Sequence, residues 1–122
     1  MNRQFKEIKR ARKESLLLKE ISNFFLRIAQ EEPSLQGLYI SHVKLSSDYG
    51  ICSVFFHTSD GKEKFKEQLP LLILYKPSLR SAIAKAVEGR YTPNLIFKYD
   101  EVFDKQQKVN ELIEKLKTEG KL

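Results

Sequence analysis

The first twenty residues carry a dense group of positive charges. Seven Lys or Arg residues stand there against three acids. Six of the seven fall within residues 3–13, namely Arg3, Lys6, Lys9, Arg10, Arg12 and Lys13. Clustered Lys and Arg side chains attract polyanions and displace counterions from phosphates. On the residues alone the cluster fits a phosphate-rich partner and a solvated helix end equally well.

A second excess of positive charge lies in residues 61–90, again with seven Lys or Arg residues against three acids. Each of these two stretches is net +4, and the formal charge of the chain is +6 because residues 21–60 are net −2 and residues 91–122 are balanced. Four cations lie along one expected helix or just beyond it, namely Lys76, Arg80, Lys85 and Arg90. Lys and Arg side chains can contact phosphates, and Arg can also stack on unpaired bases. Surface cations that only favour a helix C-terminus, or a charge that serves solubility, are the alternatives.

Residues that usually carry catalysis or bind metals are scarce. One cysteine, Cys52, and two histidines, His42 and His57, give no spacing typical of a zinc site. The chain has no phosphate-binding glycine loop and no Gly-x-Ser-x-Gly or His-Glu-x-x-His motif. We therefore expect no catalytic residue, no metal and no cofactor, and Cys52 should be a small buried hydrophobe. A nuclease is the last of the functional hypotheses.

Length and composition predict one domain that spans residues 1–122. Apolar residues make up 41% of the chain, enough for a core, and no apolar run reaches the roughly 18 residues of a membrane span. The N-terminus lacks the apolar region of a secretory signal, and a lone cysteine cannot form an internal disulfide. We expect a cytoplasmic monomer that acts on neither a membrane nor a small molecule.

The apolar spacing predicts a long first helix over residues 3–30, which Glu31-Glu32-Pro33 would end. Its inward stripe is expected to contain Leu17, Ile21, Phe24 and Ile28, widened by Leu18 and Phe25. Residues 1–13 would project beyond the core or become ordered on a partner. Residues 38–45 and 50–57 then predict a hairpin, with Asp48 capping its turn.

The second strand should point Cys52, Val54 and Phe56 to one face of the sheet and Phe55 to the other, where Tyr39 would join it. Aromatic side chains on an open sheet can stack bases, but covering an exposed face is the favoured interpretation. Asp60 and Glu63 form a capping-box pattern for a helix that would break near Lys76-Pro77. Its apolar face would come from Phe65, Leu69, Leu72 and Ile73.

The second helical piece is expected over residues 78–88, ending at Gly89, and a third strand over residues 94–99. Asp104 would cap a final helix with an apolar stripe at Val109, Leu112, Ile113 and Leu116, followed by a flexible tail at residues 118–122. The order helix, strand, strand, broken helix, strand, helix predicts an α+β fold. In it, a three-stranded sheet carries helices packed on one face.

This order resembles the type II K-homology fold, and local motifs resemble the ribosome-binding factor A family over nearly the whole chain, from about Arg10 to Leu116. The first half of that pattern is matched by Glu32-Pro33-Ser34-Leu35, Val43-Lys44-Leu45-Ser46-Ser47-Asp48 and Cys52-Ser53-Val54-Phe55-Phe56. The second half is matched by Leu79-Arg80, Arg90, Pro93-Asn94-Leu95-Ile96-Phe97 and Asp100. Glycines 37, 50, 61, 89 and 120 form no Gly-x-x-Gly loop, and Tyr75-Lys76-Pro77 occupies the place of the family's Ala-x-Gly kink.

The resemblance implies a non-catalytic assembly factor that binds 16S ribosomal RNA on the free, immature 30S subunit. Such factors assist late maturation and processing of the RNA 5′ end without cutting it, and are often needed most in the cold. The resemblance favours phosphate contact for the ten cations named above. The runner-up hypothesis is a protein-interaction adaptor that uses the outer sheet face around Phe55 and Ile96.

Overall fold

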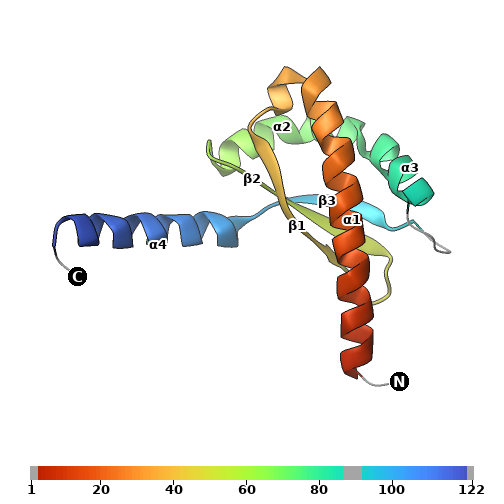
Figure 1. Cartoon of the computed structure of the whole chain (residues 1–122). Coiled ribbons are helices and arrows are strands. Elements are labelled where there is room, and N and C mark those ends of the chain that lie inside the picture. Colours follow the sequence, from red (N-terminus) through yellow and green to blue (C-terminus); the bar gives the residue numbers. More distant parts are fainter. Residues whose placement is uncertain (1–2, 87–91, 121–122) are drawn as a thin grey trace.

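A mixed sheet of three strands in the order β1-β2-β3 lies at the centre of the computed structural model, which describes residues 3–86 and 92–120. Figure 1 shows the elements around it, which are α1 (Arg3–Glu31), the 3-10 helix η1 (Pro33–Leu35), β1 (Leu38–Leu45), β2 (Ile51–Thr58), α2 (Lys62–Leu74), α3 (Lys76–Ala86), β3 (Asn94–Tyr99) and α4 (Glu101–Thr118). The side chains of Arg3 and Asp104 are outside the description. The predicted α+β fold class is confirmed.

The strands pair as a hairpin followed by a crossover. β1 and β2 are antiparallel, with Leu45 opposite Cys52 next to the turn, and β3 runs parallel to β2. Parallel neighbours need a crossover connection, which α2 and α3 provide. The inward side chains of β2 form the middle of the core, because Cys52, Val54 and Phe56 are all fully buried.

Phe56 joins the layers of the core. Its ring lies 5.5 Å from that of Phe25 on α1, 5.9 Å from that of Phe65 on α2 and 5.5 Å from that of Phe97 on β3. Helices α1, α2 and α3 cover this one face of the sheet (Figure 1). The stripe of α1 differs from the prediction in one place. Phe25 is buried against the sheet, whereas Phe24 is half-buried and faces a groove beside α3.

The start of α2 differs from the capping-box prediction, which is wrong. Gly61 precedes the helix with φ of 90°, and no side chain caps it. The Asp60 N–H is instead bonded to Thr58 Oγ1 at 3.3 Å, so the chain forms a turn before the helix begins. The predicted break is confirmed at Tyr75, whose hydroxyl donates a 2.6 Å hydrogen bond to Glu32. Pro70 does not interrupt α2.

The last helix is the main departure from the sequence expectation. Asp100, and not Asp104, caps α4, because its side chain accepts a hydrogen bond from the Phe103 N–H. In Figure 1, α4 extends away from the sheet and the other helices. Val109 and Leu112, expected to pack inward, are 55% and 56% exposed. Apolar periodicity predicted a helix but could not show what would cover it.

Candidate nucleic-acid interface

The N-terminal half of α1 presents its cations to solvent. Lys6, Lys9 and Arg12 are exposed, and Arg10 and Lys13 are half-buried. The apolar residues between them do not pack either, since Phe5 is 53% and Ile8 54% exposed. Figure 1 shows this half of the helix continuing past the end of the sheet. Within residues 3–13 the only acid is Glu7, so this surface is strongly positive.

The turn between β1 and β2 fixes the place where α1 leaves the core. Glu14 Oε2 accepts a 2.7 Å hydrogen bond from the Leu45 N–H, and Lys13 Nζ lies 5.2 Å from the centre of the Tyr49 ring. Asp48 caps the turn as predicted, because its Oδ1 accepts from the Gly50 N–H at 2.9 Å. A hydrogen bond from Ser46 and then that from Gly50 hold the pKa of Asp48 below its ordinary value. These contacts join α1 to the hairpin turn at the point where its basic half begins.

The cations predicted on or near α3 differ in their exposure and in their contacts with the rest of the fold. Arg80 is half-buried, and its Nε and Nη2 donate to the backbone carbonyls of Pro93 and Thr92 at 3.3 and 3.2 Å. Lys76 Nζ lies 5.4 Å from the centre of the Phe97 ring. Lys85 is exposed. Arg90 falls outside the described residues. Arg80 and Lys76 therefore have contacts within the fold, and Lys85 is the more accessible cation.

A groove of about 680 Å³ lies between the side chains of α1 and α3. It is lined by Glu20, Asn23, Phe24, Arg27, Pro77, Ser78, Ser81, Ala82 and Lys85. Here the structure brings the predicted Lys85 together with Arg27, which the sequence reasoning missed. Arg27 lies in the apolar half of α1 and in a net acidic stretch, so no local charge signal marked it. Two cations and several hydroxyl and amide groups could hold phosphate here, with Glu20 opposing them.

The two predicted cationic areas remain separate in the described structure. The first groove residue of α1, Glu20, follows Lys13 by seven positions, which is about 10 Å along a helix axis. The basic half of α1 extends beyond the turn of the hairpin (Figure 1), whereas the groove is lined by the C-terminal half of α1 and by α3. A partner that contacts both areas must therefore span at least about 10 Å along α1.

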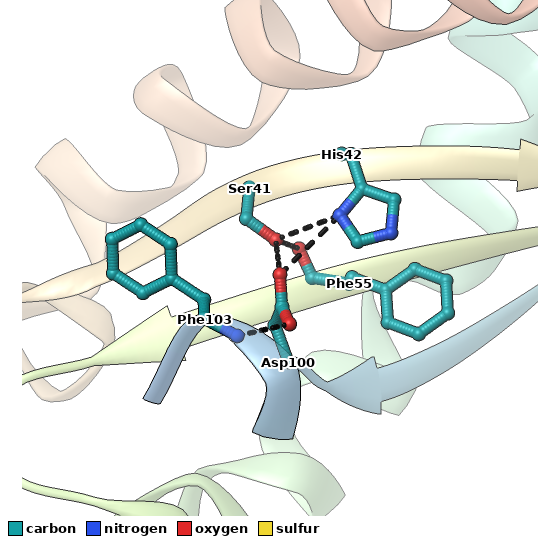
Figure 2. A network of polar contacts seen from close by, with 5 residues as sticks. All are labelled: Ser41, His42, Phe55, Asp100 and Phe103. Carbon is teal, nitrogen blue, oxygen red and sulfur yellow. Dashed lines mark hydrogen bonds and ion pairs between the residues drawn. The ribbon is translucent and has the colours of Figure 1, made fainter. Parts of the chain in front are cut away.

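The opposite face of the sheet carries a polar network at the junction with α4 (Figure 2). Asp100 Oδ2 accepts a 2.7 Å hydrogen bond from Ser41 Oγ and lies 3.3 Å from His42 Nδ1. Burial alone would raise the pKa of Asp100, but the hydrogen bonds from Phe103 and Ser41 and the nearby histidines outweigh it. Its pKa therefore lies below the ordinary value. The sequence marked Asp100 as part of the family motif, and this network was not predicted.

Neither a membrane span nor a metal-binding cluster appears in the described part of the chain. No helix in residues 3–86 or 92–120 is long and apolar enough to cross a bilayer. Within the same ranges, no three side chains of His, Cys, Asp or Glu are grouped to hold a metal ion.

The sheet order and the helix that breaks between β2 and β3, without a Gly-x-x-Gly loop, define a type II K-homology-like domain. The family model for ribosome-binding factor A matches residues 9–113. Ribosome-binding factor A of Halothermothrix orenii is 31% identical over 104 residues, covering 85% of this chain and 84% of its own. That of Prochlorococcus marinus MIT 9301 is 35% identical over 113 residues, covering 90% and 85%.

Solved structures agree with this match. The crystal structure of ribosome-binding factor A from Thermus thermophilus has a TM-score of 0.63 and 28% identity, over 74% of this chain and 93% of that one. A Thermus thermophilus model fitted into a cryo-EM map of a 30S complex has a TM-score of 0.51 and 30% identity, over 72% and 87%. The chain belongs to the ribosome-binding factor A family, which is ribosome-associated and non-catalytic.

Proposed function

We propose that the chain binds the 16S ribosomal RNA of the free, immature 30S subunit in the cytoplasm and acts there as a monomer. It assists late maturation and processing of the RNA 5′ end, and leaves before translation. The family match supports this proposal, as does the similar Thermus protein that was fitted into a 30S complex.

The basic half of α1 is the observation that carries the proposal. Five cations with described side chains, three of them exposed, extend from the fold on one helix: Lys6, Lys9, Arg10, Arg12 and Lys13. Contacts with phosphate position a protein on RNA without reading its sequence. If all five contact phosphate, log K should fall with log salt with a slope of about −4. The groove cations Arg27 and Lys85 supply further contacts, and Arg3, Lys76, Arg80 and Arg90 remain candidates.

Co-sedimentation with purified small subunits tests the proposal. The wild-type chain is compared across a salt series with a Lys6→Glu/Lys9→Glu/Arg12→Glu variant, using mature and immature subunits. A Lys105→Glu/Lys115→Glu/Lys117→Glu variant on α4 makes the same charge change at exposed positions elsewhere. We expect salt-sensitive binding that the α1 variant loses and the α4 variant retains. Equal loss in both variants would show that only net charge matters, and salt-independent binding would contradict phosphate contact.

The processing role needs a separate assay, because the chain is proposed to assist and not to cut. Purified chain alone should leave precursor 16S RNA intact. When a nuclease fraction is added to immature subunits, the wild-type chain should accelerate trimming of the 5′ end and the α1 variant should not. Trimming that is unaffected by the chain would remove this part of the proposal. Binding that survives ribonuclease treatment would favour the protein adaptor.

A further inference from the structure

Three side chains from three strands form a row across the outer face of the sheet. His42 on β1 pairs with Phe55 on β2, and Phe55 pairs with Lys98 on β3. The rings of His42 and Phe55 are stacked, with centroids 4.2 Å apart and planes 8° from parallel. Lys98 Nζ lies 5.8 Å from the centre of the Phe55 ring. The row is therefore a continuous stack with a cation at one end and an imidazole at the other.

The imidazole is held in place by the fold. His42 Nδ1 lies 3.1 Å from Ser41 Oγ and 3.3 Å from Asp100 Oδ2, and one face of the ring is covered by Phe55 (Figure 2). The Asp100 side chain is only 8% exposed, whereas the His42 side chain is 49% exposed. His42 thus offers an aromatic surface to solvent in an orientation that is set before any ligand arrives.

A hollow of about 470 Å³ lies beside this stack, between the sheet and the first turns of α4. Its lining includes His42, Lys44, Phe55, Phe103 and Gln106. The volume is within the range of about 300–1,000 Å³ that small-ligand sites occupy. The hollow therefore has room for a planar group placed against the imidazole.

The lining of the hollow holds one cation, Lys44, and two acids, Asp100 and Glu101, and Lys98 lies outside the lining on the same face of the sheet. Lys44 and Lys98 are exposed on this face, and neither forms an ion pair within residues 3–86 and 92–120. The nearby acids are already engaged, Asp100 by Ser41 and the Phe103 N–H, and Glu101 by Lys62. An anionic ligand would thus meet two available cations, while the carboxylates remain bonded within the fold.

We propose that this face is a second RNA contact, which takes an unpaired nucleotide. The base stacks on the open face of His42, and the flanking phosphates lie at Lys44 and Lys98. This inference rests on the RNA-binding function proposed above and adds the kind of RNA that the protein requires. Duplex RNA keeps its base faces covered, so only a single-stranded segment can stack in this way. A protein partner is the weaker match, because lysine is depleted at protein interfaces.

A titration of the full-length chain with RNA tests the inference. The probes are a single-stranded eight-nucleotide uridine RNA and an RNA duplex of equal length, followed by fluorescence anisotropy and by amide chemical shifts. Single-stranded RNA should shift the amides of His42, Phe55 and Lys98, and the duplex should not. A His42→Ala variant should weaken single-strand binding by about 5- to 150-fold, the range expected for one stacked base. His42→Phe, which retains a flat ring, should restore most of it.

The phosphate contacts have their own variant and control. Lys44→Gln/Lys98→Gln should weaken single-strand binding. The slope of log K against log salt should become shallower by the amount that corresponds to about two lost phosphate contacts. Lys64→Gln/Lys66→Gln on α2 removes the same charge from exposed positions and should change little. Amide spectra of each variant confirm that the fold is retained.

The possible results separate this inference from the general function. If shifts are confined to α1 and the α1–α3 groove and His42→Ala binds normally, the sheet site is wrong although RNA binding holds. If neither RNA binds and subunits do not co-sediment, the proposed function itself fails. If His42→Ala loses a subunit interaction that resists ribonuclease, the face takes a protein and the inference is overturned.

Discussion

Ser41 Oγ donates a 2.7 Å hydrogen bond to Asp100 Oδ2, across 59 positions of sequence. Asp100 Oδ1 at the same time accepts the Phe103 N–H at 2.9 Å, and the Asp100 N–H is bonded to the Phe56 carbonyl at 2.8 Å. One side chain therefore caps α4 and ties the start of that helix to β1, while its backbone continues the pairing of β3 with β2. Asp100 fixes where α4 leaves the sheet.

Replacing Asp100 with Ala should lower the free energy of unfolding by about 1–2 kcal/mol at pH 7, as the loss of a capping carboxylate does. The pKa of Asp100 is below its ordinary value in the folded protein. Its stabilising effect is therefore full above the unfolded pKa of about 3.9 and is lost as pH falls through the lower, folded value. Urea titrations of wild type and variant at pH 7, 4 and 2.5 check this.

In those titrations, the difference between wild type and Asp100→Ala should shrink toward pH 2.5. A Glu119→Ala variant, at the other end of α4, serves as the control for general helix effects. A difference that stays constant with pH would show that the capping geometry matters without the charge of the carboxylate.

Arg80 and Lys85 are expected to separate stability from binding. Arg80→Ala removes the hydrogen bonds to the Thr92 and Pro93 carbonyls that lead into β3, and should cost about 1–2 kcal/mol of unfolding free energy. Lys85→Ala should change stability by less than about 0.5 kcal/mol, because its side chain is exposed. Urea unfolding measures both stability changes, and co-sedimentation with small subunits measures the binding of each variant, which Lys85→Ala should weaken. Equal stability losses would contradict the structural role assigned to Arg80.

Cys52 should resist thiol reagents in the folded protein. Burial, with the charge of Glu14 as a smaller cause, raises the pKa of its thiol to about 12, and the side chain has no exposed surface. At pH 8 the thiol is almost wholly protonated in the folded chain, so labelling by a disulfide reagent should wait for unfolding. A Cys52→Ala/Ser53→Cys variant moves the thiol to the half-buried neighbour and should react much faster. Rapid labelling of native wild type would show that the middle of β2 opens readily.

Local patterns predicted the sheet and the helical layer well. Alternation in β2 separated Phe56 from Phe55, and Asp48 was assigned to the turn that it caps. These features depend on neighbours within a few positions, which a sequence displays directly. The two capping errors have the same origin. Asp60 and Asp104 each satisfy a local pattern, but the chain begins its helices at Lys62 and Glu101, where Gly61 and Asp100 fit the turns before them.

The candidate site was harder to predict, because it depends on contacts between distant elements. Arg27 lines the groove only because α1 packs on α3. Arg80 is hydrogen-bonded to the Pro93 carbonyl because the chain passes beside α3 just before β3 begins. The stack of His42 on Phe55 requires the register of β1 and β2, which includes an irregularity between Ile40 and His42. Charge clustering identified the basic half of α1 but gave no information on any of these relationships.

The apolar stripe of α4 gives the last prediction. Val109, Leu112 and Ile113 are 55%, 56% and 38% exposed, so the outer turns of the helix bury little against the described part of the fold. A chain shortened after Gln107 retains Asp100, the ion pair of Glu101 with Lys62, and the contact of Phe103 with His57. Its free energy of unfolding should match that of the full chain within about 0.5 kcal/mol, as expected for changes at the surface. A loss above about 1 kcal/mol would mean that the stripe is covered in solution.

Sedimentation velocity over a concentration series would then show whether a second copy or the chain's own sheet covers the stripe, because only self-association depends on concentration.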